Sequence, residues 1–181
     1  MSWIIDPSHT RAEFAVKHLM ISTVRGQFTD INGTVDFNEN DPTKSKVDVQ
    51  IGVASILTRD EKRDAHLKSP DFFEVEKYHY MIFKSKRTTK IDPLHGKLTG
   101  DLTIRDVTKE VTLDVDYAGQ AKTPWGTTSA GLTATTTINR KDWGLNWNVA
   151  LETGGVLVGD DVKINLEVEI VKQAEAEKAA A

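Results

Sequence analysis

The side chains most able to do acid–base chemistry are few and scattered along this chain. None of its histidines stands at the His-x-His or His-Glu-x-x-His spacing that places two metal ligands on one element. A nucleophile elbow, a phosphate-binding loop and a dinucleotide-binding glycine motif are all missing from the sequence. The five histidines are His9, His18, His66, His79 and His95. The sequence therefore offers no ready catalytic constellation.

The densest run of charged residues consists of Asp60, Glu61, Arg63, Asp64 and His66. On an exposed helix such a run is usually a solvated, ion-paired face. The alternative is functional, because Arg63, Asp64 and His66 together could supply acid–base chemistry to an enzyme.

Two other positions could contact a ligand. His18 lies on the apolar face of an alternating segment, where a hydrogen-bonded core histidine is more common than a ligand contact. Arg140 stands beside Lys141, Asp142 and Trp143 and could form an anion site. We expect it instead to be structural, with its guanidinium paired to a carboxylate or to loop carbonyls.

Composition excludes several functional classes. At 181 residues the chain is the size of a single domain, and its net charge of −4 argues against a nucleic-acid partner. It has no cysteine, which excludes disulfides, thiolate metal sites and a cysteine nucleophile. No apolar run approaches the roughly 20 residues that span a membrane.

The two ends of the chain carry separate expectations. The first residues lack the basic and apolar regions of a signal peptide, so we expect a cytoplasmic protein, or a periplasmic one if the sequence is a mature form. Residues 1–171 are expected to form one domain. Residues 172–181 are polar and alanine-rich, and we expect a frayed helix or a disordered tail.

Apolar and polar residues alternate over most of the chain, which is typical of half-buried strands. The alternation is interrupted at residues 20–26. It shifts its parity near Asp30, where we expect a β-bulge. Residues 119–126 are predicted to form a loop. The alternating segments are 11–18, 28–37, 47–53, 81–91, 97–104, 110–117, 132–138 and 162–170. This pattern predicts an all-β fold, an eight-stranded antiparallel barrel.

The only helical signal in the body of the chain begins near Thr58. Thr58 and Glu61 fit a capping box at a helix start, and Ser69–Pro70 resembles a second start. Phe72 and Phe73 follow, and two adjacent phenylalanines need an apolar surface to cover them. We therefore expect a short helical segment that caps one end of the barrel.

The centre of such a barrel has two interpretations. An eight-stranded barrel is just wide enough to be filled by its own side chains or to hold one slender ligand. Small residues recur at predicted inward positions, which favours a cavity, but they could equally follow the taper of a filled barrel. These residues are Ala12, Gly33, Gly100, Ala134 and Thr136.

Five blocks, taken together and in order, resemble the YceI-like family of lipocalin-like barrels that bind polyisoprenoid lipids. They span essentially the whole domain. The blocks are 3–10 (WIIDPSHT), 14–28 (FAVKHLMISTVRGQF), 63–73 (RDAHLKSPDFF), 96–104 with 107–109 (GKLTGDLTI, VTK) and 138–145 (INRKDWGL).

The resemblance implies a lipocalin-like barrel with an isoprenoid chain, or a quinone-like molecule, inside it. One departure matters: Trp143 stands where the family has Phe, a bulkier wall that would shorten or reshape the cavity. Strand parity then nominates the ligand-lining residues, with Phe72 or Phe73 as part of the lid. They are Phe14, Val16, His18, Phe28, Phe37, Phe72, Phe73, Phe83, Leu102, Ile138 and Trp143.

Two functional hypotheses result. The first is binding, transport or storage of a long apolar lipid without covalent chemistry, with no cofactor, no metal, no nucleic-acid partner and no membrane span. The second is an enzyme for an apolar substrate that uses His18 or the Arg63, Asp64 and His66 group. The sequence leaves a homodimer open.

Overall fold

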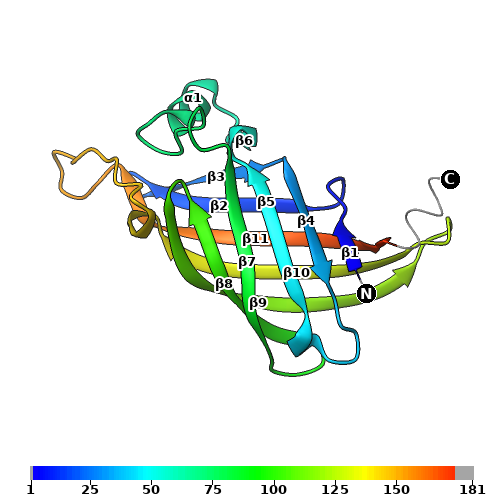
Figure 1. The fold of residues 1–181 in the computed structure, drawn as a ribbon. Coiled ribbons are helices and arrows are strands. Elements are labelled where there is room, and N and C mark those ends of the chain that lie inside the picture. The colour runs from blue at the N-terminus through cyan, green and yellow to red at the C-terminus, as the bar shows by residue number, and fades with distance from the viewer. Residues whose placement is uncertain (1, 174–181) are drawn as a thin grey trace.

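The computed structural model describes residues 2–173, and antiparallel strands make up most of it (Figure 1). The predicted tail from residue 174 onward lies outside the described residues. The strands are β1 (Ser2–Ile5), β2 (Arg11–His18), β3 (Ser22–Phe28), β4 (Ile31–Asp36), β5 (Lys46–Gly52), β6 (Ile56–Leu57), β7 (Tyr80–Lys90), β8 (His95–Ile104), β9 (Val107–Lys122), β10 (Thr128–Asn139) and β11 (Val158–Lys172). The helical elements are α1 (Glu61–Lys68) and the short 3₁₀ turns Pro42–Lys44, Val53–Ser55 and Arg140–Trp143.

Eight strands close a ring in the order β1, β4, β5, β7, β8, β9, β10 and β11, because β11 pairs back onto β1. Every pairing in the ring is antiparallel, which confirms the predicted all-β barrel. Closure leaves no edge strand in the ring that could pair with another chain.

β11 is long enough to hold two partners in succession. Its last residues, Ile170–Lys172, pair with β1, and Val158–Glu167 pair with β2. β1 and β2 therefore act as one strand interrupted at residues 6–10. β3 and β6 continue from β2 beside the ring, and α1 follows β6 at the top of Figure 1.

The interior divides into two apolar clusters. The first lies under α1 and contains Trp143, Phe28 and Phe83, with Phe73 packed against it. The second surrounds Trp3 and Ile170 at the seam between β1 and β11. Val47 and Val49 of β5 contact both clusters, so the two halves of the barrel are continuous.

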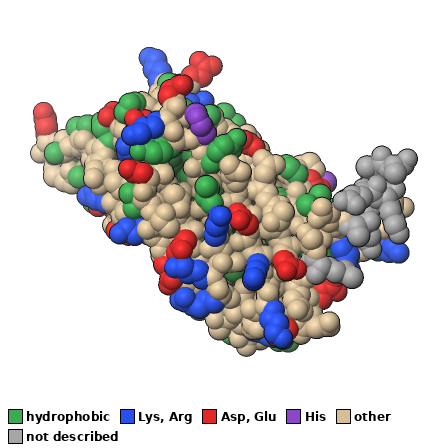
Figure 2. All heavy atoms as spheres, in the orientation of Figure 1, with side chains coloured by type: hydrophobic (Ala, Val, Ile, Leu, Met, Phe, Trp, Pro, Cys, Tyr) green, Lys and Arg blue, Asp and Glu red, His purple; other side chains and the backbone are tan. Residues whose placement is uncertain are grey.

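The outer face of β5, β7, β8 and β9 carries charges of both signs. Lys86 lies 2.7 Å from Asp101, and Arg87 lies 3.0 Å from Glu110. Figure 2 shows blue and red side chains interleaved over the visible face of the molecule. These pairs are exposed, so each contributes little to stability. Within residues 2–173, no helix has the length and apolar character needed to cross a membrane.

The helical cap is confirmed, but its predicted caps are wrong. The residue that caps α1 is Asp60, whose carboxylate accepts a hydrogen bond from the Arg63 N–H at 3.0 Å. Thr58 instead donates to Asp64 through its N–H and its hydroxyl. Ser69 does not start a second helix, because its N–H bonds to the carbonyl of His66 and closes α1.

Two segments predicted as irregular are strands. Residues 22–28 form β3, whose period is hidden in the sequence because Gly26 occupies an inward position where the Phe14 ring packs. Residues 119–122 continue β9, which extends to Lys122 before it turns. The positive φ of Leu19 and Met20 lets β2 turn directly into β3.

Candidate functional site

A cavity of about 330 Å³ opens inside the barrel at the end away from α1. It is bounded by the end of β4, the start of β5, the β7–β8 loop and the adjoining parts of β9 and β10. That loop lies at the bottom of Figure 1, opposite α1. The apolar side chains that line the cavity are Val35, Phe37, Val47, Leu94, Leu98, Val115, Tyr117 and Leu132.

Strand register places these side chains on the inner face. Residues directly opposite each other in an antiparallel pair point to the same side of the sheet. Val35 is opposite Val47, and Leu132 is opposite Tyr117. The ladder between β9 and β10 shifts at Leu132, where a bulge bends the sheet around the cavity.

Aromatic rings form one wall of this half of the barrel. The Phe37 ring lies 5.9 Å from Trp3 and 5.7 Å from Tyr117, measured between ring centroids. Trp3 is fully buried, whereas Phe37 and Tyr117 border the cavity. The three rings therefore form one continuous aromatic wall.

The rim of the cavity is polar, and its charges are mostly paired. Asp92 accepts from His95 at 2.8 Å, and Glu39 lies 3.1 Å from Lys172. The backbone N–H of Leu94 and the ring of His95 donate to Asp92 and hold the pKa of its carboxyl below the usual range. The rim is therefore close to neutral around an apolar interior.

The half under α1 is filled instead of hollow. Trp143 is 2% exposed, and its indole N–H donates to the carbonyl of Leu102 at 3.0 Å. A Cβ on residue 100 would lie 2.6 Å from the Phe83 ring, so a glycine at this position leaves room for the ring. The Phe73 ring packs edge-on against Phe28 at 5.7 Å.

A larger groove of about 1510 Å³ lies outside the barrel, over β2, β3 and β11. Charged side chains on the outer faces of these strands line it, including Arg11, Glu13, Lys17 and Lys163. It is about as open to solvent as the smaller cavity, but its lining is more polar than apolar. Three nominated residues, Phe14, Val16 and Phe28, are part of that lining. The smaller cavity is the better candidate site because it is apolar and surrounded by strands.

The eleven nominated lining residues separate into three groups. Phe37 borders the cavity. Val16, His18 and Phe72 lie outside both described clusters. The remaining residues belong to the filled half: Phe14, Phe28, Phe73, Phe83, Leu102, Ile138 and Trp143.

The acid–base group at α1 does not converge on a cavity. The Arg63 side chain donates to Thr58, and the buried Asp64 carboxylate accepts from the same residue. His66 lies 2.8 Å from Asp71 and packs edge-on against Trp147 at 4.5 Å. Arg63 and Asp64 thus fix the segment that precedes α1, and His66 fixes the loop that follows it.

His18 and Arg140 have contrasting surroundings. His18 is half-buried at the end of β2, and within residues 2–173 its imidazole has no hydrogen-bond partner and no carboxylate beside it. Arg140 is 4% exposed and donates to the carbonyls of Leu145, Trp147 and Gly159. The structural role predicted for Arg140 is confirmed.

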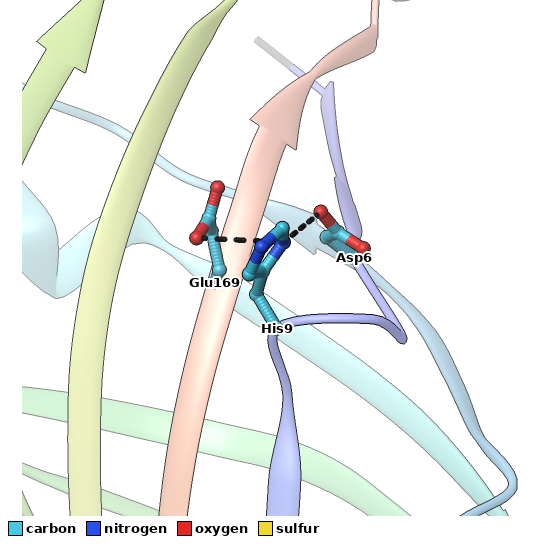
Figure 3. Close-up of side chains that lie close together, drawn as sticks. All are labelled: Asp6, His9 and Glu169. Carbon is cyan, nitrogen blue, oxygen red and sulfur yellow. Dashed lines mark hydrogen bonds and ion pairs between the residues drawn. The ribbon is translucent and has the colours of Figure 1, made fainter. Parts of the chain in front are cut away.

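A polar cluster absent from the sequence predictions lies where β1 breaks before β2. The His9 Nδ1 atom is 2.8 Å from a carboxylate oxygen of Asp6 and 3.9 Å from one of Glu169 on β11 (Figure 3). The hydrogen bond to Asp6, followed by the negative charge of Glu169, raises the pKa of His9. Burial alone would raise the pKa of Asp6, but hydrogen bonds from Ser8 and His9 outweigh it and lower that pKa.

This cluster fastens the barrel seam. The Asp6 N–H donates to the Glu169 carbonyl at 2.9 Å, and the Glu169 N–H donates to the Thr10 hydroxyl at 3.2 Å. The three donor atoms of Asp6, His9 and Glu169 lie within 4.8 Å of one another, and a nitrogen with two carboxylates is a donor set that suits a divalent cation. Their contacts to one another already account for the geometry, so we assign them a structural role.

The cavity residues that the sequence predictions missed carried a usable signal. Val47, Leu98, Val115 and Tyr117 all stand at inward positions of the alternation. Alternation identifies the inner face of a strand, but it does not say whether facing side chains meet. Which inward positions enclose empty space depends on the spatial arrangement of several strands.

Comparisons with known proteins agree with this geometry. The family model described as "YceI-like domain" matches residues 3–170. A UPF0312 protein of Staphylococcus aureus is 41% identical over 169 residues, which cover 93% of this chain and 96% of that protein. The crystal structure of the Campylobacter jejuni YceI protein has a TM-score of 0.75 and 37% identity, and the match covers 87% of this chain and 90% of that one.

Two more distant structures share the fold. Burkholderia cenocepacia BcnA has a TM-score of 0.78 at 20% identity, with coverage of 91% of this chain and 98% of that one. A polyisoprenoid binding domain from Saccharophagus degradans has a TM-score of 0.64 at 11% identity, with coverage of 93% and 97%. From the family match and these relatives, the chain belongs to the YceI-like domain family.

Proposed function

We propose that this protein binds the apolar chain of a long isoprenoid-type lipid inside its barrel, and carries or stores that lipid without covalent chemistry. The observation that carries the proposal is the apolar cavity at the end away from α1, with its paired, nearly neutral rim. A chain that enters there leaves water and contacts Val47, Val115 and Leu132.

Burial of the chain alone can supply useful affinity. Each buried CH₂ contributes about 0.8 kcal/mol, which is about a fourfold gain in affinity. The cavity volume of about 330 Å³ is at the lower end of the range for small-molecule pockets. We therefore expect affinity to rise with chain length and to level off once the cavity is full.

The relatives support the class of ligand. The Saccharophagus degradans protein is a polyisoprenoid binding domain, and its barrel has the same fold as this one. At 11% identity this likeness concerns the fold, so the ligand class comes to this chain as part of the proposal.

The proposal of binding without catalysis rests on the surroundings of the cavity. Among the residues that the structure describes, the only histidine that lines the cavity is His95, which is engaged by Asp92 and lies 3.6 Å from Asp116. His18 and the Arg63, Asp64 and His66 group lie elsewhere. No observation favours the enzyme hypothesis.

The test combines extraction with titration. Organic extraction and mass spectrometry of the purified protein should release a long-chain lipid, and prenols of increasing length should bind with rising affinity. Leu132→Arg places a charge in the cavity and should abolish binding. Thr135→Arg, on the exposed outer face of the same strand, is the matched control and should bind normally. Affinity that is flat with chain length, or binding that survives Leu132→Arg, would contradict the proposal.

A further inference from the structure

Thr88 on β7 has a hydroxyl without a hydrogen-bond partner. Its Oγ1 atom is buried, and no described residue bonds to it. Thr88 lies opposite Leu98 in the β7–β8 ladder, so both side chains point to the inner face, and both line the cavity. Of the buried polar side-chain atoms without a partner in the described chain, this is the only one whose residue lines the cavity.

An unsatisfied hydroxyl is costly and uncommon. A buried polar group without a partner costs about 1–3 kcal/mol, whereas a valine has the same shape at no such cost. Two threonine pairs on the outer face of β8 and β9 bond to each other: Thr99 to Thr112 at 2.9 Å, and Thr103 to Thr108 at 2.7 Å. The Thr88 hydroxyl, in contrast, belongs to a cavity-lining residue and bonds to no described residue.

The charge around the cavity favours a neutral partner for this hydroxyl. Lys97 is bonded to Asp114 at 2.5 Å, and Glu39 is paired with Lys172. Lys90 lines the mouth and forms no ion pair with a described residue, but it is exposed to solvent. A charged head group at the depth of Thr88 would lose its hydration and would gain no buried counter-ion.

We propose that the Thr88 hydroxyl binds the polar end of a neutral lipid, an alcohol or a carbonyl compound, whose chain occupies the cavity. This inference rests on the proposed lipid-binding function. A hydroxyl both donates and accepts, so it fits either oxygen group. Thr88 lies two residues inside Lys90, about 7 Å along the strand, which places the polar end just below the mouth. The chain then extends toward Val35 and Val47.

The test compares three ligands with one carbon skeleton: a prenol, the hydrocarbon without the hydroxyl, and the prenyl diphosphate. The wild-type protein should prefer the prenol over the hydrocarbon on the order of 2- to 10-fold, the value of one net hydrogen bond. Thr88→Val should remove this preference and leave hydrocarbon affinity unchanged. The diphosphate should bind no tighter than the prenol.

The controls separate folding, function and head-group recognition. Thr137→Val, on an exposed position of β10, should keep the prenol preference. Thr88→Val without ligand should melt at the wild-type temperature or above, because it removes an unsatisfied hydroxyl. A lower melting temperature, a preserved preference or a tighter diphosphate would overturn the inference while lipid binding stands. If neither the prenol nor the hydrocarbon binds, the proposed function itself fails.

Discussion

The two halves of the barrel are built from the same strands, yet one is filled and the other is hollow. Under α1, aromatic rings meet glycines: Phe83 packs on Gly100, and Phe14 packs on Gly26. At the opposite end, Phe37 and Tyr117 lie against each other along one wall and leave the centre open.

The comparison shows how one alternating pattern gives two interiors. A small residue opposite a large ring admits that ring and fills the core, so glycines at inward positions do not by themselves indicate a cavity. A large ring that packs sideways on another ring lines the wall and leaves space. We therefore expect the filled half to govern stability and the hollow half to govern binding.

The largest contrast should come from truncation of one aromatic side chain in each half. Trp143→Ala removes a fully buried ring and its hydrogen bond, and should lower the free energy of unfolding by about 3–5 kcal/mol. Tyr117→Ala removes a half-buried ring at the cavity and should cost only about 1–2 kcal/mol. Urea unfolding measures both, and equal costs would contradict the distinction.

The two ends of the barrel should also differ in how strongly they control the rate of ligand release. Phe73→Ala removes a ring that packs on Phe28 and should cost about 2–3 kcal/mol, but the release rate of a bound fluorescent prenol should stay within about twofold. Leu94→Ser, at the mouth, should speed release with little loss of stability because Leu94 is already 55% exposed. Stopped-flow release measures both. Faster release from Phe73→Ala, or from Phe72→Ser with Phe73→Ser, would instead identify α1 as the lid.

Replacing one inward valine by phenylalanine in each half should also distinguish the two halves. Val111→Phe overpacks the filled half and should cost about 1–3 kcal/mol. Val47→Phe extends into the cavity, so it should cost less than about 1 kcal/mol and weaken prenol binding by at least about 10-fold. Thermal melting and prenol titration on both variants provide the measurement. A Val47→Phe protein that binds normally would mean that the ligand lies elsewhere.

The smallest effect concerns the polar cluster at the seam of the hollow half. His9 has a raised pKa, so its contribution is complete below its ordinary value of 6.5 and is lost as the pH rises through the folded value. Asp6 has a lowered pKa, so its contribution is complete above its ordinary value of 3.8 and is lost as the pH falls through the folded value. The cluster is thus most stabilising between these two ordinary values.

His9→Gln tests this pH window. The difference in melting temperature between wild type and His9→Gln should be largest near about pH 5 and should shrink as the pH rises through the raised pKa of His9. His79→Gln is the control, because His79 bonds to the carbonyl of Val75 and faces no carboxylate in the described chain. A difference that does not change with pH would rule out the charged contact.

Most of the strands, the barrel and the family were predictable from the sequence. Period-2 alternation is a local property, and it identified the inner face of β2, β5, β8, β9 and β11 directly. The structural role of Arg140 was also predictable, since the several N–H donors of a guanidinium are commonly satisfied by a carboxylate or by loop carbonyls. The hidden strand β3 shows the limit, because Gly26 erases the apolar signal at its position.

Which half of the barrel is hollow could not be predicted from the sequence, because it depends on contacts between distant strands. Val47 and Val111 are both inward valines in the sequence and both contact the first cluster, but only Val47 also borders the cavity. The difference depends on whether rings from other strands reach across the barrel at that level. The unpaired hydroxyl of Thr88 was likewise not predictable from the sequence, because only the positions of its neighbours in the fold show that it has no partner among the described residues.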